Sequence, residues 1–492
     1  MAKIKHPDEI AFAGDYNLEH IDLISHSGVV LDLKNIVQEL NIYESIYKNA
    51  VTGSIVVADA NNFIGKMEIQ GLERLSFKLE TPGVDPKDNL SIDASVETGN
   101  PFHVYKISDR RQLNQNLTLY TLHFASREFM RNIRTKVSQA YEGTLDDAVR
   151  NIFSDKSYLD SRKTLYYEPT GNSNKIVIPN MTPFNAINMI AQKALPEKSK
   201  GVGGVGYYFY ETTKGFYFRS WDNICSNVGG ERRRPIQQFY YMPAKMKDPT
   251  IEDEIGHQYK SVESYRFINN FHDVAANTAL GTYGHRVITH NLFDKSYRKD
   301  DYNYHNQFGD TIHADHENEH TDRSKYPIVD SVVDYDNEKN VSDYPESRVS
   351  LQSSTKFLHD DDVGMYGIDA FQDSKKTGEK ISQSNQVVHG TVLKLVVKGQ
   401  SYIESGDVIE FNIRPNDTHK SILEPKDHRF AGKYIVTKIR HKVSNNEYKM
   451  VLECSKDSSF SPLARRGTKW TTEKREGSKK SLYSYRQTNY AR

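Results

Sequence analysis

Alternation of apolar and polar side chains at two places in the chain predicts most of its β-structure. Residues 74–80 alternate Leu, Phe and Leu with Arg, Ser, Lys and Glu, and residues 447–454 place Tyr, Met, Leu and Cys at every second position. A period of two is typical of a strand that buries one face. We therefore predict a β-barrel domain at 20–125 and a second, discontinuous one at 235–270 plus 385–456.

Helical spacing dominates the segment between these two β-domains. Apolar residues recur at intervals of three and four in 127–141 and in 144–153, where Thr144 is placed as an N-cap. Thr182 followed by Pro183 is another helix start, because proline favours the first helical position. These patterns predict helices that begin at 127, at Thr144 and at Thr182.

An aromatic hairpin, residues 207–221, comes next, with its turn at Lys214–Gly215. With the helices it defines an α+β linking domain at 126–234. Aromatic faces of this kind either pack within a sheet or offer a stacking platform for bases or sugars, and the shortage of basic neighbours favours packing. Carbohydrate binding by these aromatics, Trp221 among them, is the alternative that they allow.

Three further segments lack a clear apolar period. Residues 1–19 are predicted to form an N-terminal arm, and residues 271–384 a polar insertion domain with a short helix near 379–388. Residues 457–492 are rich in Lys and Arg and predict a flexible basic tail, which is either solvated or folds on a partner. The predicted fold class is β-dominated α+β, with two tube-like β-barrel domains joined by an α+β domain.

Composition narrows the functional classes. The 492 residues include 65 basic and 65 acidic side chains, so no global field attracts nucleic acid or anionic lipid. The mean hydropathy of −0.70 is very polar, yet 31 Tyr and 21 Phe are too many for a disordered chain. Cys225 and Cys454 alone supply no disulfide framework. We expect no secretory signal and no membrane contact, because no apolar run is long enough.

One short motif suggests a metal site. His316 to His320 match H-E-x-x-H, which binds zinc when both histidines lie on one face of a packed helix. The flanking residues have almost no apolar stripe, so a solvated loop is the favoured interpretation. A structural ion held by His305, His313, His316 and His320 stays open as an alternative, as does a zinc-dependent hydrolase built on His316 and His320.

Other matches lack the context that their chemistry needs. Residues 201–206 match G-x-G-x-x-G, but they follow a helix and precede a strand, which reverses the order of a dinucleotide site. Asp360–Asp362 lack the alternating ligands of a calcium loop. Cys454 belongs to the predicted strand core, and neither cysteine is placed as a nucleophile. We therefore assign no catalytic, cofactor-binding or metal-binding residue and expect no enzyme activity and no cofactor.

Four ordered segments carry a family resemblance. Residues 41–63, 178–191, 402–411 and 432–443, in this order, resemble the central baseplate hub protein of T4-like contractile-tailed phages, the family that joins the tail tube to the spike. The resemblance spans about 21–270 and 385–456 and leaves the insertion and the basic tail uncovered.

The resemblance implies a structural function. It implies a homotrimeric ring in which two similar barrels per chain create pseudo-sixfold symmetry, so that the ring adapts a hexameric tail tube to a trimeric cell-puncturing spike. The partners it implies are the spike, the tail-tube or tube-initiator proteins and other baseplate subunits, in the virion tail after assembly in the host cytoplasm. DNA would cross the ring without specific binding, so we expect a neutral or acidic channel wall. The hub of a related contractile injection system is the alternative.

Overall fold

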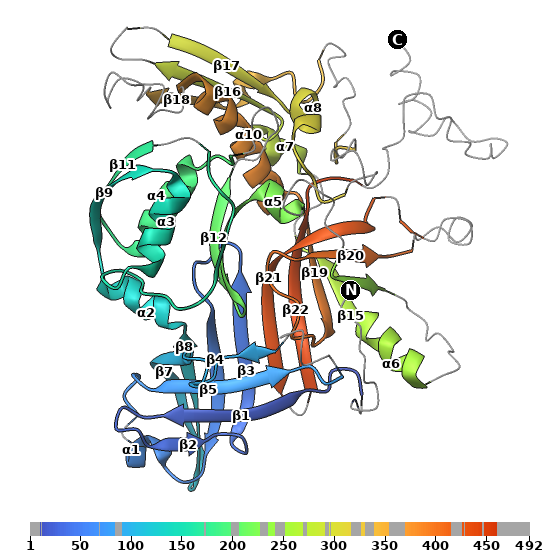
Figure 1. Ribbon diagram of the computed structural model, residues 1–492. Coiled ribbons are helices and arrows are strands. Elements are labelled where there is room, and N and C mark those ends of the chain that lie inside the picture. Colours follow the sequence, from blue (N-terminus) through green and yellow to red (C-terminus); the bar gives the residue numbers. More distant parts are fainter. Residues whose placement is uncertain are drawn as a thin grey trace, which may run out of the picture.

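Figure 1 shows a computed structural model of the protein. It describes residues 10, 12–67, 69–83, 91–171, 174–197, 206–226, 235–241, 251–268, 273–290, 295, 297–315, 326–329, 339–353, 370–414, 426–427, 429–444 and 447–459. Among these residues no helix is both long enough and apolar enough to cross a bilayer.

Within the described residues, 14 strands form one sheet that contains both predicted β-domains. The first β-region comprises β1 (Asn17–Ile24), β2 (Val30–Asp32), β3 (Val37–Ser45), β4 (Thr52–Asp59), β5 (Arg74–Glu80), β6 (Ile92–Asp93), β7 (Phe102–Asn114) and β8 (Leu117–Ala125), with the short helix α1 (Phe63–Met67) after β4. The second β-region comprises β14 (Gln237–Tyr240), β15 (Val262–Phe267), β19 (Thr391–Lys398), β20 (Val408–Asn412), β21 (Gly432–Ser444) and β22 (Glu447–Lys456). The predicted β-dominated fold class is confirmed.

The two β-regions meet where β21 pairs with β3, which we call the joint. The pairing is antiparallel and runs from Lys438 opposite Ser45 to Ser444 opposite Glu39. On both sides of the joint the neighbours are also antiparallel, in the order β19-β22-β21-β3-β4-β8. A local twofold axis at the joint therefore relates the hairpin β3–β4 to the hairpin β21–β22.

The second β-region closes on itself. Its strands follow the order β14-β20-β21-β22-β19-β15, and a bridge between Tyr240 and Ser261 brings the start of β15 back to β14. The edge-to-edge joint between the two regions was not anticipated from the sequence. A period of two identifies strands, but it does not identify their neighbours.

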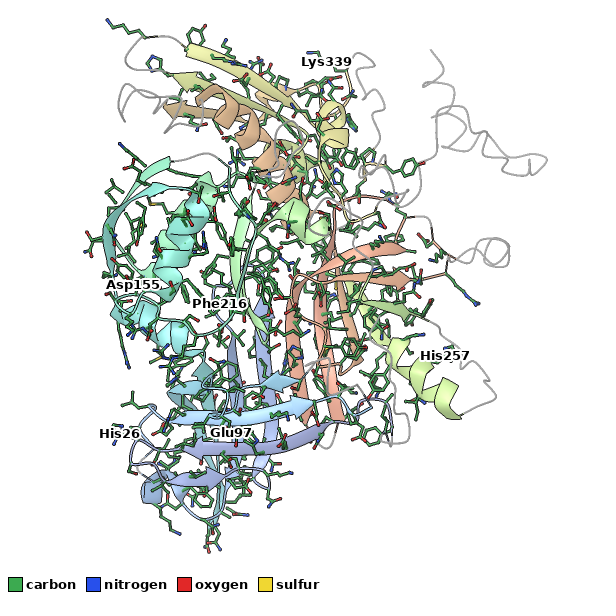
Figure 2. The ribbon with its side chains drawn as sticks, in the orientation of Figure 1. His26, Glu97, Asp155, Phe216, His257 and Lys339 are labelled. Carbon is green, nitrogen blue, oxygen red and sulfur yellow. The ribbon has the colours of Figure 1, made fainter. Side chains whose placement is uncertain are left out.

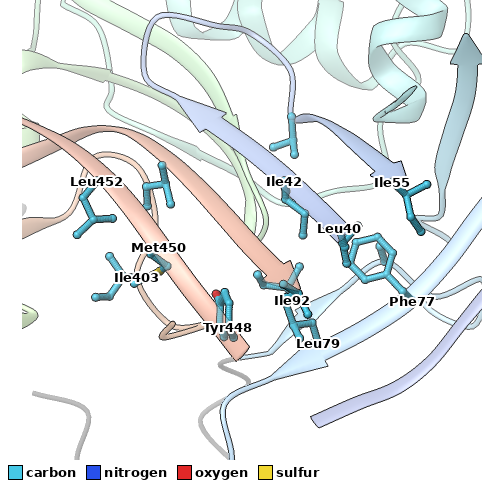
Figure 3. Close-up of a cluster of buried hydrophobic side chains, with 14 of the residues drawn as sticks. Leu40, Ile42, Ile55, Phe77, Leu79, Ile92, Ile403, Tyr448, Met450 and Leu452 are labelled. Carbon is cyan, nitrogen blue, oxygen red and sulfur yellow. The ribbon is translucent and has the colours of Figure 1, made fainter. Parts of the chain in front are cut away.

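A single apolar core lies under the joint. Figure 3 shows side chains of the first β-region, such as Ile42 and Phe77, in one cluster with Tyr448 and Leu452 of the second. Each of these four is at most 1% exposed. Cys454 belongs to the same cluster, as its place in the alternating pattern predicts.

The linking region lies above the first β-region in Figure 1. Its elements are α2 (Arg127–Arg134), β9 (Val137–Gly143), α3 (Leu145–Ser154), β10 (Leu165–Tyr167), β11 (Asn174–Met181), α4 (Pro183–Lys193), β12 (Tyr207–Thr212), β13 (Gly215–Ser220) and α5 (Trp221–Cys225). Thr144 and Thr182 occupy the N-cap positions of α3 and α4, as predicted, although neither side chain accepts a capping hydrogen bond from the helix backbone. The prediction that helical structure continues to residue 141 is wrong, because Val137–Gly143 forms strand β9 and pairs antiparallel with β11.

The insertion is folded where it is described. It contains α7 (Val274–Ala279), β16 (Gly284–His290), β17 (Tyr297–Asn303), α8 (Tyr304–Gln307), the 3-10 turns Phe308–Asp310 and Pro345–Ser347, β18 (Val349–Ser353) and α10 (Ala370–His389). The strands form a sheet in the order β17-β16-β18, and α10 packs on it. The short helix predicted near 379–388 is the end of the longer α10. Helix α6 (Ile251–Lys260), before β15, was also missed.

The predicted N-terminal arm is attached to both β-regions. Ile10 and Ala13 pack against Tyr259 beside the second region, and the carbonyl of Gly14 accepts a hydrogen bond of 2.9 Å from the backbone N–H of Tyr448. Strand β1 then begins at Asn17, inside the range assigned to the arm. The chain thus crosses from the second β-region to the first within a few residues.

Candidate functional site at the joint between the two β-regions

The polar face of the joint carries a ladder of ion pairs. Glu39 of β3 pairs with Arg440 at 3.2 Å and with Lys442 at 3.1 Å on β21, and Lys438 pairs with Glu453 of β22 at 2.6 Å. These pairs cross from strand to strand, where opposite charges attract over short distances. Every cation that β21 presents on this face therefore has a carboxylate beside it.

The ladder continues across β22 to β19 and β15. Glu447 accepts from Lys398 at 2.6 Å and pairs with Lys449 at 3.1 Å, and Glu263 of β15 lies 2.8 Å and 3.0 Å from the same two lysines. The contacts raise the pKa of both lysines; hydrogen bonding to Glu263 is the main cause for Lys449, whereas at Lys398 the two glutamates outweigh a burial effect that acts to lower it. Each cation of the ladder therefore has a carboxylate beside it, although four glutamates serve five cations and the ladder keeps one positive charge in excess.

Beneath the ladder a buried carboxylate connects four parts of the chain. Glu44 of β3 accepts hydrogen bonds from the backbone N–H groups of Thr213, at 2.8 Å, and of Ser405, at 3.0 Å. Its Oε1 lies 3.8 Å from His441 Nε2 on β21, and both side chains are fully buried. Burial acts to raise the pKa of Glu44, but hydrogen bonding and the charge of His441 outweigh it, so the pKa is lowered. Glu44 is therefore ionised at neutral pH.

The turn of the β12–β13 hairpin is wedged beside this carboxylate. The Thr212 hydroxyl donates to Glu404 at 2.7 Å, the Tyr217 hydroxyl donates to the other oxygen of Glu404 at 2.6 Å, and Lys214 Nζ donates to the Tyr402 carbonyl at 2.8 Å. Burial raises the pKa of Glu404. The hairpin predicted from the aromatic run thus anchors the linking region to the second β-region.

The aromatic run is packed inside the protein. Phe209 is 3% exposed, Phe216 and Phe218 are fully buried, and Trp221 is 1% exposed. Figure 2 shows Phe216 in the interior between the linking helices and the sheet. Rings without free faces cannot stack on bases or sugars, so the carbohydrate-binding alternative is wrong for these residues and the packing interpretation is correct.

A second buried polar cluster lies at the end of β22, in the C-terminal clasp (Lys456–Ser459). Asp457 accepts hydrogen bonds from His313 Nδ1 at 3.0 Å, Trp221 Nε1 at 3.3 Å and the Ala314 N–H at 3.2 Å. Burial acts to lower the pKa of His313, but the charge of Asp457 outweighs it and the pKa is raised; the pKa of Asp457 is lowered in turn by His313 against its own burial. The two side chains form a buried ion pair.

The clasp also contacts Asp315 and Tyr326. On one side Lys456 Nζ lies 3.0 Å from the carboxylate of Asp315, and the Asp315 N–H donates to Ser458 Oγ at 3.2 Å. On the other side the Ser459 N–H donates to the Tyr326 carbonyl at 2.9 Å. Residues 457–459 are thus buried within the fold, although the basic tail was predicted to begin at 457. Residues 460–492 lie outside the described residues.

The candidate metal ligands are dispersed where they are described. His305 contacts Ser342 Oγ at 2.8 Å and the Val329 carbonyl at 2.9 Å, whereas His313 belongs to the clasp cluster. His316 and His320 lie outside the described residues, as do the Gly-rich residues 201–205 and the aspartates 360–362. No group of three potential metal ligands occurs within the part of the chain that the structure describes.

A polar cavity of about 140 Å³ separates the first β-region from the linking region. Its floor contains Lys163, which pairs with Glu211 at 2.5 Å and Glu128 at 3.4 Å. Burial raises the pKa of Glu211 to about 7. All three side chains belong to the linking region, and Glu211 also accepts a hydrogen bond of 2.8 Å from the Val51 N–H of the first β-region.

None of these residues is predicted from the sequence to be functional. The signal that could have found the ladder is the alternation of charges on the polar side of two predicted strands, Lys438, Arg440 and Lys442 on one and Glu447, Lys449 and Glu453 on the next. Glu44, His441 and Asp457 give no such signal, because a buried charged residue cannot be distinguished from an exposed one in a single sequence.

Solved structures with a similar arrangement include phage tail proteins. The tail protein from Neisseria meningitidis MC58 aligns with 90% of this chain and 97% of its own, with a TM-score of 0.48 and 11% identity. The 43 kDa tail protein of prophage MuSo2 from Shewanella oneidensis aligns with 89% and 98%, with a TM-score of 0.46 and 9% identity. A type VI secretion system component of E. coli aligns with 87% and 76%, with a TM-score of 0.40 and 8% identity.

No protein-family model matches this sequence, and no curated protein matches it.

Proposed function

We propose that this protein is a structural hub of a contractile phage tail baseplate. Three copies form a ring that joins a hexameric tail tube to a trimeric spike, and other baseplate subunits attach to it. The observation that carries the proposal is the joint, where one chain places two antiparallel three-stranded modules side by side about a local twofold axis. A chain that carries two docking modules lets a threefold ring present six of them.

The rigidity of the joint supports this function. A ring that transmits force between a tube and a spike requires its modules to keep a fixed relative position. Backbone pairing of β21 with β3, a shared apolar core and the buried Glu44 all restrain that position. We propose a fitting function without turnover or cofactor.

The first prediction concerns assembly. Native mass spectrometry of the purified full-length chain, or of its mixture with the spike protein of the same particle, is expected to give a species of three times the 56.5 kDa chain mass. Only monomers and dimers in both samples would contradict the proposed ring. The related alternative, a hub of a contractile injection system, predicts the same trimer, and co-purification with sheath and tube proteins of a secretion cluster rather than of a virion separates the two.

The second prediction concerns the ion-pair ladder, which we propose faces the DNA passage. Changing Glu39, Glu263, Glu447 and Glu453 together to Gln removes the carboxylates but keeps the side-chain shapes. The freed cations are then expected to bind duplex DNA, with the logarithm of affinity falling by about 0.9 per neutralised phosphate for each unit in the logarithm of salt. Fluorescence anisotropy with a labelled duplex measures this, and the native protein is expected to show no such binding.

A matched control makes the same change in net charge elsewhere. Glu19, Glu97, Glu142 and Glu197 are exposed and lie away from the ladder. Their change to Gln is expected to leave DNA binding absent. Equal DNA binding by both variants would mean that net charge causes the effect and not the freed cations of the ladder. DNA binding by the native protein would contradict the proposal that DNA crosses the passage without specific binding.

A further inference from the structure

The β7–β8 hairpin extends beyond the core of the first β-region. Every residue from Asp109 to Asn116 is exposed, yet β7 and β8 stay paired there, with Arg111 opposite Leu119 and Asn114 opposite Leu117. Two strands without a packed face are marginally stable in water. A hairpin that stays paired while fully exposed is expected to pack against another molecule.

The shape of the hairpin end is specified locally. Register shifts interrupt the pairing of β7 with β8 between Ser108 and Arg111 and again between Gln112 and Asn114. Asp109 adopts a left-handed conformation with φ of 54°. Bulges of this kind bend a ribbon and re-aim its side chains. The bend is therefore a defined feature and not a frayed end.

The charge of the hairpin end differs from that of the joint. Arg110 and Arg111 are exposed, and neither has an ion-pair partner among the described residues, while the nearby Asp109 accepts a hydrogen bond from Ser108. Each cation of the ladder, by contrast, has a glutamate within 3.2 Å. The chain compensates its cations across the joint and leaves these two arginines uncompensated.

The hairpin end also presents an apolar side chain. Leu113 is 58% exposed between the arginines and the turn. Pairing of Asp59 with Thr118 places the turn beside the end of β4 and the adjoining α1, at the lower end of Figure 1, opposite the insertion. Arginine with an aliphatic neighbour is typical of a protein contact, because guanidinium groups bind carboxylates in pairs of hydrogen bonds.

We propose that the β7–β8 hairpin end docks an acidic protein surface, and that this surface belongs to the tail tube. The inference rests on the proposed hub function and names one contact, in the first β-region, through which each chain meets the tube. Arg110 and Arg111 pair with carboxylates of the tube protein, and Leu113 inserts between them. Duplex DNA is the competing polyanion, but the hairpin end has no aromatic ring on which bases stack.

Arg110→Glu combined with Arg111→Glu tests the proposal in the full-length trimer. Binding to purified tail-tube protein of the same particle is measured by biolayer interferometry at low and high salt. The double variant is expected to bind at least about tenfold more weakly and to lose most of the salt dependence, since exposed charges act mainly on association. Leu113→Asp is expected to weaken binding without altering the salt dependence. Both variants should have the same melting temperature as the native protein, because these side chains are exposed.

The control reverses two exposed cations of another region, Arg134 and Lys136. It is expected to bind tube protein as the native chain does. Equal binding by the hairpin variant and the native chain overturns the docking proposal and leaves the hub proposal standing. A native trimer that does not bind tube protein overturns both. Binding of the hairpin to duplex DNA that the double variant abolishes, with tube binding retained, assigns the arginines to nucleic acid instead.

Discussion

Asp457→Ala is expected to destabilise the protein by about 3–5 kcal/mol, the usual cost of removing one partner of a buried ion pair. The change leaves His313 without its counter-charge and the Trp221 and Ala314 N–H groups without an acceptor. The loss should concentrate in the insertion, which the clasp holds. Hydrogen exchange measured by mass spectrometry is therefore expected to accelerate at 311–315 and in β16–β18 while the first β-region stays protected.

The pH dependence identifies the ion pair as the cause. Because the pKa of His313 is raised in the folded protein, its contribution to stability is complete below the unperturbed pKa of 6.5. That contribution is lost as the pH rises through the pKa of the folded state. Because the pKa of Asp457 is lowered, its contribution to stability is present above the unperturbed pKa of 3.8 and is lost as the pH falls through the pKa of the folded state. The stability difference between native and variant protein should thus be largest between these two unperturbed values and shrink at higher pH.

Asp147→Ala is the matched control for this experiment. Asp147 also pairs with a cation, Arg150, but its side chain is 52% exposed. Solvent screens such a pair, so the control should lose at most about 1 kcal/mol. If Asp457→Ala and Asp147→Ala unfold alike, and their difference from the native protein does not vary with pH, the clasp does not hold the insertion.

Glu44→Ala is expected to loosen the joint. Two backbone N–H groups, of Thr213 and Ser405, lose their acceptor in a fully buried place, at about 1–3 kcal/mol each. Denaturant unfolding should show this loss. Hydrogen exchange should accelerate in β3 and β21 together, because the carboxylate connects both strands to the β12–β13 turn. Native mass spectrometry is expected to show a smaller trimer fraction.

The neighbouring Glu39 supplies the control on the same strand. Glu39→Ala removes a half-exposed carboxylate from the ladder and should change stability by no more than about 1 kcal/mol. Glu44→Gln keeps one acceptor oxygen and should fall between the two alanine variants. A Glu44→Ala protein as stable as Glu39→Ala would mean that the backbone pairing alone holds the joint.

Strands with clean alternation were predictable because burial and polarity agree in them. In 447–454 the buried positions are Tyr448, Met450, Leu452 and Cys454, all apolar. In β16 the pattern is mixed: His285 and Thr289 are buried beside Val287, whereas Ile288 faces outward. The sequence of that strand therefore shows no period of two, and it predicts a polar segment where the insertion holds a folded sheet.

The joint and the clasp could not be predicted for a different reason. Glu44 and His441 meet across about four hundred residues of sequence, and their burial depends on the tertiary fold. The residues of the ladder alternate visibly, but only the register of β21 against β3 assigns each cation its glutamate. Sequence periodicity specifies faces, whereas partners between distant strands follow from packing.

The long-range pairing at the joint has a consequence for synthesis of the chain. Strand β3 leaves the ribosome early, whereas its partner β21 is made only after residue 432. Until then β3 exposes unpaired backbone groups and an incomplete core, a state that favours association with other nascent chains. Closing so large a loop is slow, since contacts between distant residues fold late. Yield of soluble protein should therefore depend on translation rate and temperature more than on final stability.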